Sequence, residues 1–287
     1  MKKIRIGGVP EHFNYPWHYG IEHQLFAKNG LEIEWSDIKG GSGAMCKKLE
    51  DDSLDLALVL TEGIVAHIHQ GGTARIVQQY VKSPLIWGVH ASQKFIKSGK
   101  PLSQAKFARS RIGSGSHIMA YVLAEQNNFE ISESNFETVD NIDGAIKAFE
   151  NGSADVLLWE KFMTQPYVNL GKMARISECI SPRPCFVLVA SKRFLDTNSN
   201  SLLALSDAII MASEIAMKRE TTISEISKMY ALEVKQVKHW YSSVEWQTSD
   251  WISTKMLENV STTLHRVGVI NKLLPAKEMC YSRAKLY

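Results

Sequence analysis

The chain has 287 residues, of which 45% are hydrophobic and 22% are charged, and its formal net charge is +3. This length suits one large domain or two medium-sized ones with a substantial core. The small net charge and the absence of a basic block argue against a nucleic-acid-binding protein, and no run of about 18 apolar residues is present to span a membrane.

The amino-terminal sequence MKKIRIGGVPEHF contains two lysines but no apolar segment after them. Because a signal peptide needs such a segment, we expect the chain as printed to be cytoplasmic, and a periplasmic location would require that a leader had been removed. The cysteines are scattered and lack the spacing of metal ligands: Cys46, Cys179, Cys185 and Cys280. We therefore expect reduced, buried thiols and no metal.

The first part of the chain predicts alternating strands and helices. A short strand ends at RIGG (residues 5–8), and a helix follows over 19–28, closed by the C-cap signal Asn29-Gly30. The predicted elements that follow are a strand over 31–38, a helix over 43–50 and a strand over 56–60. The last strand is continuously apolar, which is typical of a parallel strand covered on both faces.

The same order recurs further along the chain. A strand ends at RIGS (residues 111–114), and the predicted elements that follow are a helix over 117–127, a strand over 135–142, a helix over 143–150 and a strand over 156–159. The order β-α-β-α-β therefore occurs twice, and it predicts two α/β lobes with parallel sheets and right-handed crossovers.

An internal duplication supports this division. The segments LEDDSLDLALVLTEG (49–63) and FENGSADVLLWEKF (149–162) share three residue pairs at an offset of 100 positions: Glu50 and Glu150, Ser53 and Ser153, Asp55 and Asp155. In both segments a polar turn releases the chain into an apolar strand that ends in an acid, Glu62 or Glu160.

The last third of the chain has a different pattern. The segment CFVLVASKRFL (185–195) predicts a final strand, and residues 200–268 show helical periodicity with few strand signals. We expect these helices to pack on the first lobe. The predicted division is a discontinuous lobe 1 (1–88 plus 190–287) and an inserted lobe 2 (89–189).

Two glycine-rich turns, GGSG (40–43) and GSGSH (113–117), could bind a phosphate or a dinucleotide or carry a catalytic serine. A phosphate-binding loop of the Walker type needs a Lys-Ser/Thr pair that neither turn has, and a dinucleotide fingerprint needs glycine where Ile118 stands. The turn at 40–44 resembles a nucleophile elbow with alanine in its last place, but no downstream Asp and His can be paired with it. No catalytic residue is predicted.

The physical property that both turns share is a helix start with small side chains. Backbone N–H groups and the positive end of the helix dipole can hold a carboxylate, sulfonate or phosphate-like group there. The alternative is that the glycines only make tight turns between strand and helix. The residues concerned are Gly41, Ser42 and Gly43 in one turn, and Ser114, Gly115, Ser116 and His117 in the other.

Two further features suggest ligand contact. The pair Glu11-His12 follows the first strand and precedes Phe13 and Trp17, a pattern that suits a ligand-reading loop. The strand-end acids described above form an acid/base pair, bind a ligand amine, or cap a neighbouring helix. The sequence leaves these alternatives open.

The order IRIGGVP, GLEIEW, GGSGAM, LDLALVLTEG, RIGSGSH, ADVLLWEKF and CFVLVAS resembles the type II periplasmic-binding-protein fold over nearly the whole chain. Within that fold it is most similar to the nitrate/sulfonate/taurine-type solute-binding proteins of ABC transporters, a class that includes relatives of thiamin-pyrimidine synthase. The segments PEHFNYP (10–16), WEKFMTQPY (159–167) and SPRPCF (181–186) resemble a narrower cytosolic group without signal peptides from bacteria and fungi.

This resemblance implies an α/β fold of two lobes, each a mainly parallel sheet flanked by helices, joined by hinge strands and closing on a ligand in the cleft between them. We expect a monomer that binds neither nucleic acid nor a cofactor. The ligand-binding residues that it implies are Glu11, His12, Phe13, Trp17, Gly41, Ser42, Gly43, Thr61 and Glu62 in lobe 1, Ser114, Gly115, Ser116, His117, Trp159 and Glu160 in lobe 2, and Arg183 and Cys185 near the hinge.

The function implied is small-molecule binding without turnover, with an anionic or zwitterionic ligand such as a sulfonate, a carboxylate or a pyrimidine-like compound. An ABC transporter permease would be a partner if the protein were exported. The alternative is an enzyme like thiamin-pyrimidine synthase, with a pyridoxal cofactor and a histidine, or another cytosolic metabolic enzyme on the same fold. The synthases carry a cysteine-rich run that this chain lacks. The effector domain of a transcription regulator, which needs a helix-turn-helix, ranks last.

Overall fold

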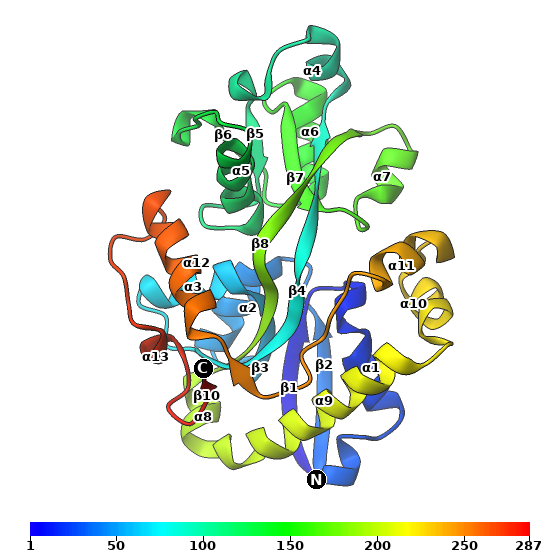
Figure 1. Ribbon diagram of the computed structural model, residues 1–287, viewed down its shortest axis with the longest axis vertical. Coiled ribbons are helices and arrows are strands. Elements are labelled where there is room, and N and C mark those ends of the chain that lie inside the picture. Colours follow the sequence, from blue (N-terminus) through cyan, green and yellow to red (C-terminus); the bar gives the residue numbers. More distant parts are fainter. The chain divides into compact units, whose positions relative to one another are not determined.

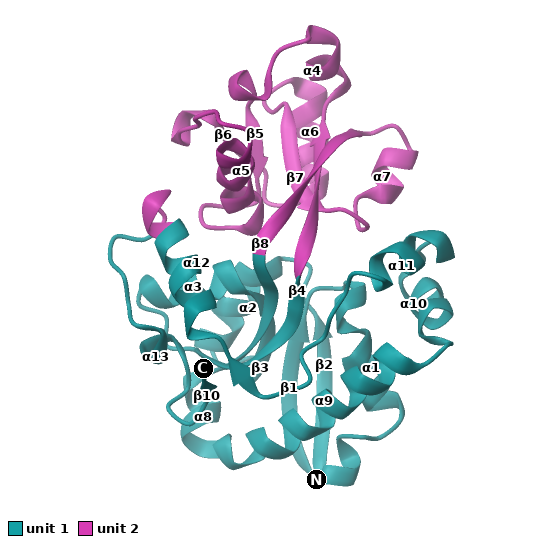
Figure 2. Ribbon diagram, viewed as in Figure 1, with its two compact units in different colours: residues 1–83, 183–263, 270–287 teal, residues 84–182, 264–269 magenta.

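The computed structural model describes residues 1–287 (Figure 1). The chain forms two compact units (Figure 2): unit 1 comprises residues 1–83, 183–263 and 270–287, and unit 2 comprises residues 84–182 and 264–269. The two main boundaries lie inside two long strands, β4 (Arg75–Ala91) and β8 (Ala174–Ala190). The predicted lobe boundaries fall further along these same strands.

Unit 1 contains a sheet with the strand order β2-β1-β3-β8. β1 (Lys2–Gly8) pairs in parallel with β2 (Leu31–Asp37) and with β3 (Leu56–Leu60), and β3 pairs antiparallel with β8. Helix α1 (Tyr15–Glu22) lies between β1 and β2 in the chain, α2 (Gly41–Glu50) lies between β2 and β3, and α3 (Thr61–His69) follows β3.

Unit 2 repeats this plan with the strand order β4-β7-β5-β6. β5 (Phe107–Arg109) pairs in parallel with β6 (Phe136–Thr138) and with β7 (Val156–Glu160), and β7 pairs antiparallel with β4. The connecting helices are α5 (Gly115–Gln126) and α6 (Ile142–Asn151). The predicted α/β class, with mainly parallel strands flanked by helices, is confirmed.

The duplicated aspartates fix equivalent turns in the two units. The Asp55 carboxylate accepts a hydrogen bond from Arg5 N at 2.9 Å, and its carbonyl accepts one from Ser191 N at 2.9 Å. In unit 2 the Asp155 carboxylate accepts a hydrogen bond from Lys106 N at 2.9 Å, and its carbonyl accepts one from Ser92 N at 2.9 Å. The same two strand junctions are therefore held by the same type of contact.

The two long strands also end alike. Ser92 follows β4 and caps α4 (Gln93–Ser98), whereas Ser191 follows β8 and caps α8 (Lys192–Asn198). Each hydroxyl accepts a hydrogen bond from the backbone N–H three residues later, the usual N-cap contact. The strand predicted over 185–195 therefore stops at Ala190, because the serine cap starts a helix there.

The first predicted helix needs correction. The pattern predicted a helix over 19–28, but α1 begins at Tyr15, with Pro16 in its first turn, and ends at Glu22. Proline suits that position because its missing N–H would have no helical partner there. The chain leaves the helix where Gln24 adopts the left-handed conformation, with φ of 57°.

The remaining elements complete the two units. Unit 2 also contains α7 (Gln165–Asn169), and short 3-10 turns occur at His12–Asn14, Ala27–Asn29, Leu102–Gln104, Glu133–Asn135 and Ser199–Ser201. The later helices are α9 (Leu202–Lys218), α10 (Thr222–Tyr230), α11 (Val234–Tyr241), α12 (Thr254–Arg266) and α13 (Ala276–Met279), and a small parallel pair is formed by β9 (Trp251–Ile252) and β10 (Lys285–Leu286).

One helical stretch, Lys192–Lys218, is long and apolar enough to cross a membrane by length and composition alone. The sequence predicted no such stretch. Of its most apolar window, 44% is buried, and α9 packs on α1 so closely that a Cβ at Gly20 would lie 3.5 Å from the Cβ of Ala212. Core helices of globular domains meet the same criteria, so this is weak evidence for a membrane span.

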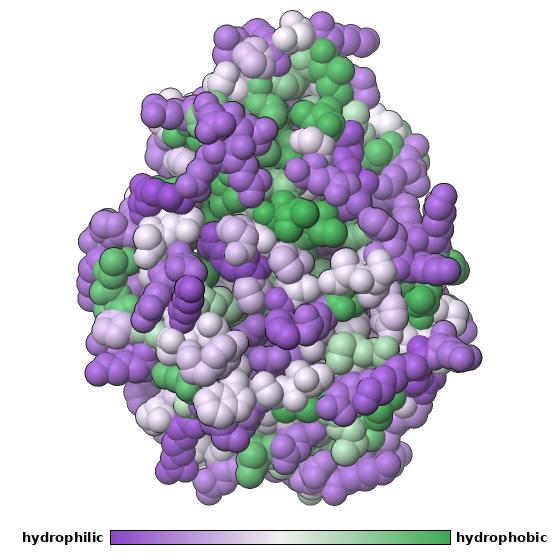
Figure 3. All heavy atoms as spheres, in the orientation of Figure 1, coloured by the Kyte–Doolittle hydropathy of each residue, from purple (hydrophilic) through white to green (hydrophobic).

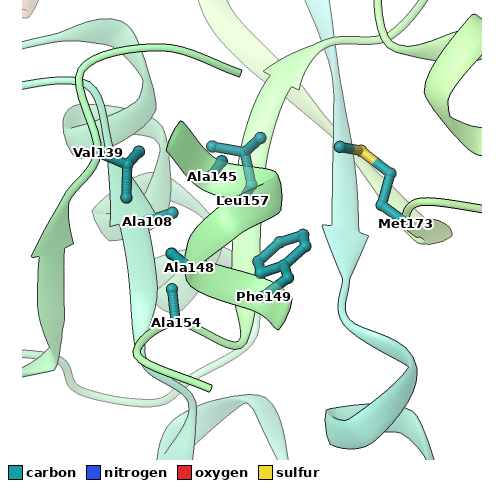
Figure 4. Packing of buried hydrophobic residues seen from close by; sticks show 8 residues of the cluster. All are labelled: Ala108, Val139, Ala145, Ala148, Phe149, Ala154, Leu157 and Met173. Carbon is teal, nitrogen blue, oxygen red and sulfur yellow. The ribbon is translucent and has the colours of Figure 1, made fainter. Parts of the chain in front are cut away.

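A cluster of small and apolar side chains forms the core between α6 and the sheet of unit 2 (Figure 4). Its members are Ala108, Val139, Ala145, Ala148, Phe149, Ala154, Leu157 and Met173, and Trp159 packs against it. On the face drawn in Figure 3, hydrophilic residues cover most of the surface and apolar residues form smaller patches.

Candidate functional site

In unit 1 two helices begin next to each other at the carboxyl end of β3. The backbone N–H of Leu60 donates a hydrogen bond to the Ser42 hydroxyl at 3.2 Å. A Cβ at Gly63 would lie only 2.7 Å from the Cβ of Ser42, so glycine is required for this approach of α2 and α3. The positive dipole ends of two helices are thereby brought together, an arrangement that attracts anions.

Glu62 lies in the first turn of α3 and is 1% exposed. One of its carboxylate oxygens, Oε2, has no hydrogen-bond partner. Burial raises the pKa of the carboxyl, and the charge of nearby Arg183 opposes this shift. The Thr61 hydroxyl donates to the carbonyl of Pro184 at 3.0 Å, which ties the start of α3 to the part of β8 that carries Arg183 and buried Cys185.

The segment after β1 contributes aromatic rings to the same part of unit 1. The ring of Phe13 lies 5.3 Å from that of Phe186, centroid to centroid. The carbonyl of Phe13 accepts two hydrogen bonds of 2.8 Å, from the Tyr80 hydroxyl and from the Trp246 indole N–H. These two hydrogen bonds hold the backbone of the predicted ligand-reading loop in place at Phe13.

Within that loop, Glu11 is half-buried and His12 is fully buried. The His12 ring lies edge-on to Trp240, with 4.1 Å between ring centroids, and burial lowers the pKa of His12 to about 3. His12 is therefore neutral at physiological pH and presents no positive charge to an anion.

Trp17 does not join this group. It is 0% exposed, and its ring stacks on Phe26 at a centroid distance of 5.3 Å, with Trp35 and Tyr80 as further ring neighbours. Because α1 begins at Tyr15, its first turn carries the indole inward. The structure therefore places this predicted ligand contact in the core of unit 1.

The glycines of the 40–43 turn act through backbone conformation. Gly41 has φ of +63°, in the left-handed region that favours glycine, and a Cβ there would meet no atom within 4 Å. Gly43 is half-buried in the first turn of α2. The turn is open above Gly41, so a ligand can approach its backbone.

In unit 2 the serines of the 113–117 turn are engaged with their own backbone. Ser114 caps α5 by accepting from His117 N at 3.3 Å, and Ser116 Oγ accepts from Ser110 N at 3.0 Å. The two hydroxyl oxygens lie 3.0 Å apart, so one hydroxyl donates to the other. Only one of the two hydroxyl protons is then left to donate to a ligand. The backbone at Gly115, where α5 begins, is the other group that a ligand could contact.

His117 is held on both sides. Its Nδ1 accepts from Gly113 N at 3.1 Å, so in the neutral ring Nε2 carries the proton. Glu133 Oε1 is the acceptor for Nε2 at 3.0 Å, and Arg109 Nη1 lies 2.9 Å from the same nitrogen. Arg109 Nη1 donates to the other Glu133 oxygen at 2.7 Å. Burial, aided by the Arg109 charge, lowers the pKa of His117 to about 4. The imidazole is therefore neutral at physiological pH, and both of its nitrogens have polar neighbours within unit 2.

Glu160 ends β7 and is buried. Its Oε2 accepts hydrogen bonds from Phe162 N at 2.9 Å and from Met163 N at 2.7 Å, while Oε1 has no partner. Burial raises the pKa of this carboxyl to about 7, against the effect of these N–H groups and of Arg175. Its neighbour Trp159 faces the α6 core, because successive strand residues point to opposite faces.

Two residues near Glu160 escaped the sequence-based prediction. Trp87 of β4 is paired directly with Glu160 of β7, so their side chains share one face of the sheet, and the buried Trp87 indole N–H has no acceptor. The buried Nε of Arg175 also lacks a partner, although Nη2 donates to the Lys161 carbonyl at 2.8 Å. Only the antiparallel register of β4 and β7 reveals the pairing, and no local pattern encodes it.

The side chains that could ligate a metal are dispersed. No group of three or more His, Cys, Asp or Glu residues could hold a metal ion, and all four cysteines are reduced and buried. The strand-end residues are instead suited to hydrogen bonds and charge pairing.

Comparison with known proteins agrees with this arrangement. The CA3427 gene product of Candida albicans, described as having the generic periplasmic-binding-protein fold, superposes with a TM-score of 0.86 at 22% identity, covering 100% of this chain and 98% of the other. The family model described as Ca3427-like PBP matches residues 87–179. This chain has the periplasmic-binding-protein fold.

Other proteins with this fold are similar at lower identity. The alkanesulfonate-binding protein SsuA of Xanthomonas axonopodis pv. citri, bound to MOPS, has a TM-score of 0.79 at 12% identity, with 98% of each chain covered. The nitrate-binding protein NrtA of Synechocystis PCC 6803 has a TM-score of 0.72 at 13% identity, with 96% of this chain and 84% of the other covered. A search of curated proteins gave no match in sequence.

Proposed function

We propose that the chain is a small-molecule-binding protein, and that its ligand carries an anionic group together with N–H donors. In each unit, the residues proposed to bind a ligand are those at the strand ends. The observation that carries this proposal is the pair of buried acids, Glu62 and Glu160, each with one carboxylate oxygen that has no hydrogen-bond partner.

An unpaired buried oxygen is costly to maintain. Leaving such an acceptor without a donor costs about 1–3 kcal/mol, which is why most buried polar atoms are paired. Both acids follow an apolar strand, at the edge where proteins with open α/β sheets bind ligands. An ammonium, amidine or amide N–H of a ligand would supply the missing donor at each site.

The anionic part of the ligand is matched by different groups. In unit 1 the starts of α2 and α3 lie together near the Arg183 guanidinium. In unit 2 the start of α5 offers backbone N–H groups and one serine hydroxyl. Relatives with this fold are named for binding alkanesulfonate and nitrate, both anions, which supports an anionic group in the ligand of this chain.

The proposal is tested by thermal unfolding in the presence of matched compounds. Taurine and isethionate are both small sulfonates, but taurine has an ammonium where isethionate has a hydroxyl. β-Alanine and 3-hydroxypropionate form the equivalent carboxylate pair. We expect the amino member of at least one pair to raise the melting temperature more than its hydroxyl partner.

Variants locate the effect. Glu62→Gln and Glu160→Gln should each reduce the difference between the paired compounds, because an amide cannot offer an ionised oxygen to an ammonium group. Glu150→Gln is the matched control, since Glu150 is exposed and makes only a 3.6 Å ion pair with Lys172. Equal stabilisation by both members of each pair, unchanged in the Glu62 and Glu160 variants, would contradict the proposal.

A further inference from the structure

A cavity lies wholly within unit 1 and has none of the strand-end residues in its lining. Its volume is about 260 Å³. Strands β4 and β8 contribute Val77, Gln78 and Leu188, helix α9 contributes Leu202 and Ser206, and the chain after α13 contributes Arg283. This volume is somewhat below the range of about 300–1,000 Å³ typical of sites for drug-sized ligands.

Two polar side chains of this cavity are buried without hydrogen-bond partners. Gln78 is 4% exposed and its Oε1 has no donor, and Ser206 is 8% exposed and its Oγ makes no hydrogen bond. The Gln78 oxygen can only accept, so it calls for a hydroxyl or an N–H, whereas the Ser206 hydroxyl can both donate and accept.

Two of the charged side chains that line the cavity form an ion pair with each other, and a third has no ion-pair partner. Lys285 and Asp250, which both line it, form an ion pair of 2.8 Å. Arg283 lines the same cavity, is exposed, and makes no ion pair. The Arg283 guanidinium therefore carries a positive charge that the Lys285–Asp250 pair does not balance. It is suited to a carboxylate or phosphate, which a guanidinium can bind with two hydrogen bonds.

The wall that carries Arg283 is fixed to the sheet. Tyr281 N donates to the carbonyl of Ile76 at 2.9 Å, and Ile76 forms a parallel bridge with Cys280. Further on, Thr254 N donates to the carbonyl of Tyr287 at 3.0 Å, beside the β9–β10 pair. The carboxyl-terminal segment is therefore anchored at both ends of the stretch that borders the cavity.

We infer that this cavity is a second ligand-binding site, for a small hydroxylated acid. The acid group pairs with Arg283, and its hydroxyls donate to Gln78 Oε1 and bond with Ser206 Oγ. A bound acid would displace the water that otherwise occupies this cavity and would supply partners for both atoms. This inference is independent of the proposed function of the strand-end site.

The test uses gluconate as the probe, with two controls of similar length. Sorbitol keeps the hydroxyls but lacks the acid, and hexanoate keeps the acid but lacks the hydroxyls. Binding to the full chain is followed by NMR of labelled Leu and Val methyl groups, which reports directly on Val77, Leu188 and Leu202. We expect saturable shifts of these methyls with gluconate, and at least tenfold weaker binding of both controls.

Two variants complete the design. Arg283→Gln changes an exposed side chain, so it should leave the fold intact and weaken gluconate binding at least tenfold, as expected for loss of a charged hydrogen bond. Gln78→Met should also weaken it, while Lys235→Gln, an exposed residue of α11 that is no part of the cavity, should have no effect.

Three results would overturn the inference. The cavity holds only water if none of the three probes shifts its methyls at tens of millimolar. It is an apolar pocket if hexanoate binds as well as gluconate, and a polyol site without an acid requirement if sorbitol does. Unchanged gluconate affinity in Arg283→Gln would likewise contradict the assignment.

Discussion

Units 1 and 2 repeat one strand order, but they use their duplicated acids differently. Glu50 of unit 1 accepts hydrogen bonds from Thr73 N at 2.8 Å, from the Thr73 hydroxyl at 2.7 Å and from Ala74 N at 3.2 Å, and it pairs with His67 at 2.8 Å. Its counterpart Glu150 makes only one exposed ion pair.

The aspartates differ in the same direction. Asp55 accepts from the Arg5 side chain through both oxygens, at 2.9 and 3.2 Å, and from Arg193 at 2.9 Å, in addition to its backbone contact. The Asp155 carboxylate accepts one hydrogen bond, from Lys106 N. These duplicated positions therefore have more hydrogen-bond partners in unit 1 than in unit 2.

The strand-end acids do not follow this trend. Glu62 and Glu160 are both buried, and each keeps one oxygen without a partner although their remaining surroundings differ. The unit-specific contacts stabilise the fold, whereas a buried oxygen without a donor lowers its stability. This contrast is the basis for the proposal that the strand-end acids bind the ligand.

The largest expected effect on stability comes from replacing Asp55, compared with its counterpart Asp155. Asp55→Ala should lower the free energy of unfolding by about 2–4 kcal/mol, because it removes several charged hydrogen bonds and leaves the partly buried Arg5 unpaired. Asp155→Ala should cost only about 0.5–1.5 kcal/mol, the range for one hydrogen bond. Urea unfolding of both variants measures the difference, and equal losses would contradict the comparison of the two units.

Replacing the Glu160 carboxyl with an amide should increase the stability of the protein. Its folded pKa of about 7 lies above the ordinary value of 4.5, so wild-type stability should fall as pH rises from 4.5 to 7. Glu160→Gln removes that loss, and we expect it to stabilise the protein by about 1–3 kcal/mol at pH 8 and by little at pH 4. Thermal unfolding across this pH range tests the sign, and destabilisation at pH 8 would show that the carboxyl has a structural role instead.

Glu50 should show the opposite dependence on pH. Burial raises its pKa, but the hydrogen bonds from Thr73, His67 and Ala74 outweigh this and lower the pKa to about 2. The stabilisation is therefore present above pH 4.5 and is lost as pH falls towards 2. Glu50→Gln should cost about 1–2 kcal/mol at pH 7 and less at pH 3, against less than about 0.5 kcal/mol for the exposed Glu150→Gln. A pH-independent loss in Glu50→Gln would show that charge is not the cause.

The smallest expected effect concerns the serine turn. Ser116→Ala removes an acceptor for Ser110 N, so it should cost about 0.5–1.5 kcal/mol of stability with or without ligand. Ser42→Ala in unit 1 removes the equivalent acceptor for Leu60 N and is the matched variant. If Ser116→Ala lowered ligand affinity but left the stability of the free protein unchanged, the Ser116 hydroxyl would have no structural role, which would contradict this prediction.

Local patterns predicted much of the fold. The apolar run Leu56–Leu60 coincides with β3, and the repeat of Glu, Ser and Asp correctly predicted two α/β units of the same strand order. The long strands were harder to predict, because Pro84 and Pro182 interrupt patterns that end up within β4 and β8. A proline lacks the N–H that marks a regular strand, so only the continuous apolar part of β8 was predicted.

The residues of the candidate site were harder to predict from the sequence than the fold. Glu62 and Glu160 could be found because each ends an apolar strand, but burial and hydrogen bonding of one oxygen depend on residues far along the chain. Trp17 was assigned to the ligand because an aromatic residue after a strand suits either a site or a core, and only packing decides between them. Trp87 was missed because its relation to Glu160 exists only in the antiparallel register.

The most direct test of the central claim is native mass spectrometry of the protein purified in a volatile buffer, for the wild type and the double variant Glu62→Gln/Glu160→Gln. We predict that the wild type carries a small molecule that is released on denaturation and contains both an acidic group and nitrogen-bound hydrogens. The double variant should lose most of this species, while Glu150→Gln retains it. Equal occupancy of wild type and double variant, or a released ligand without N–H groups, would contradict the account.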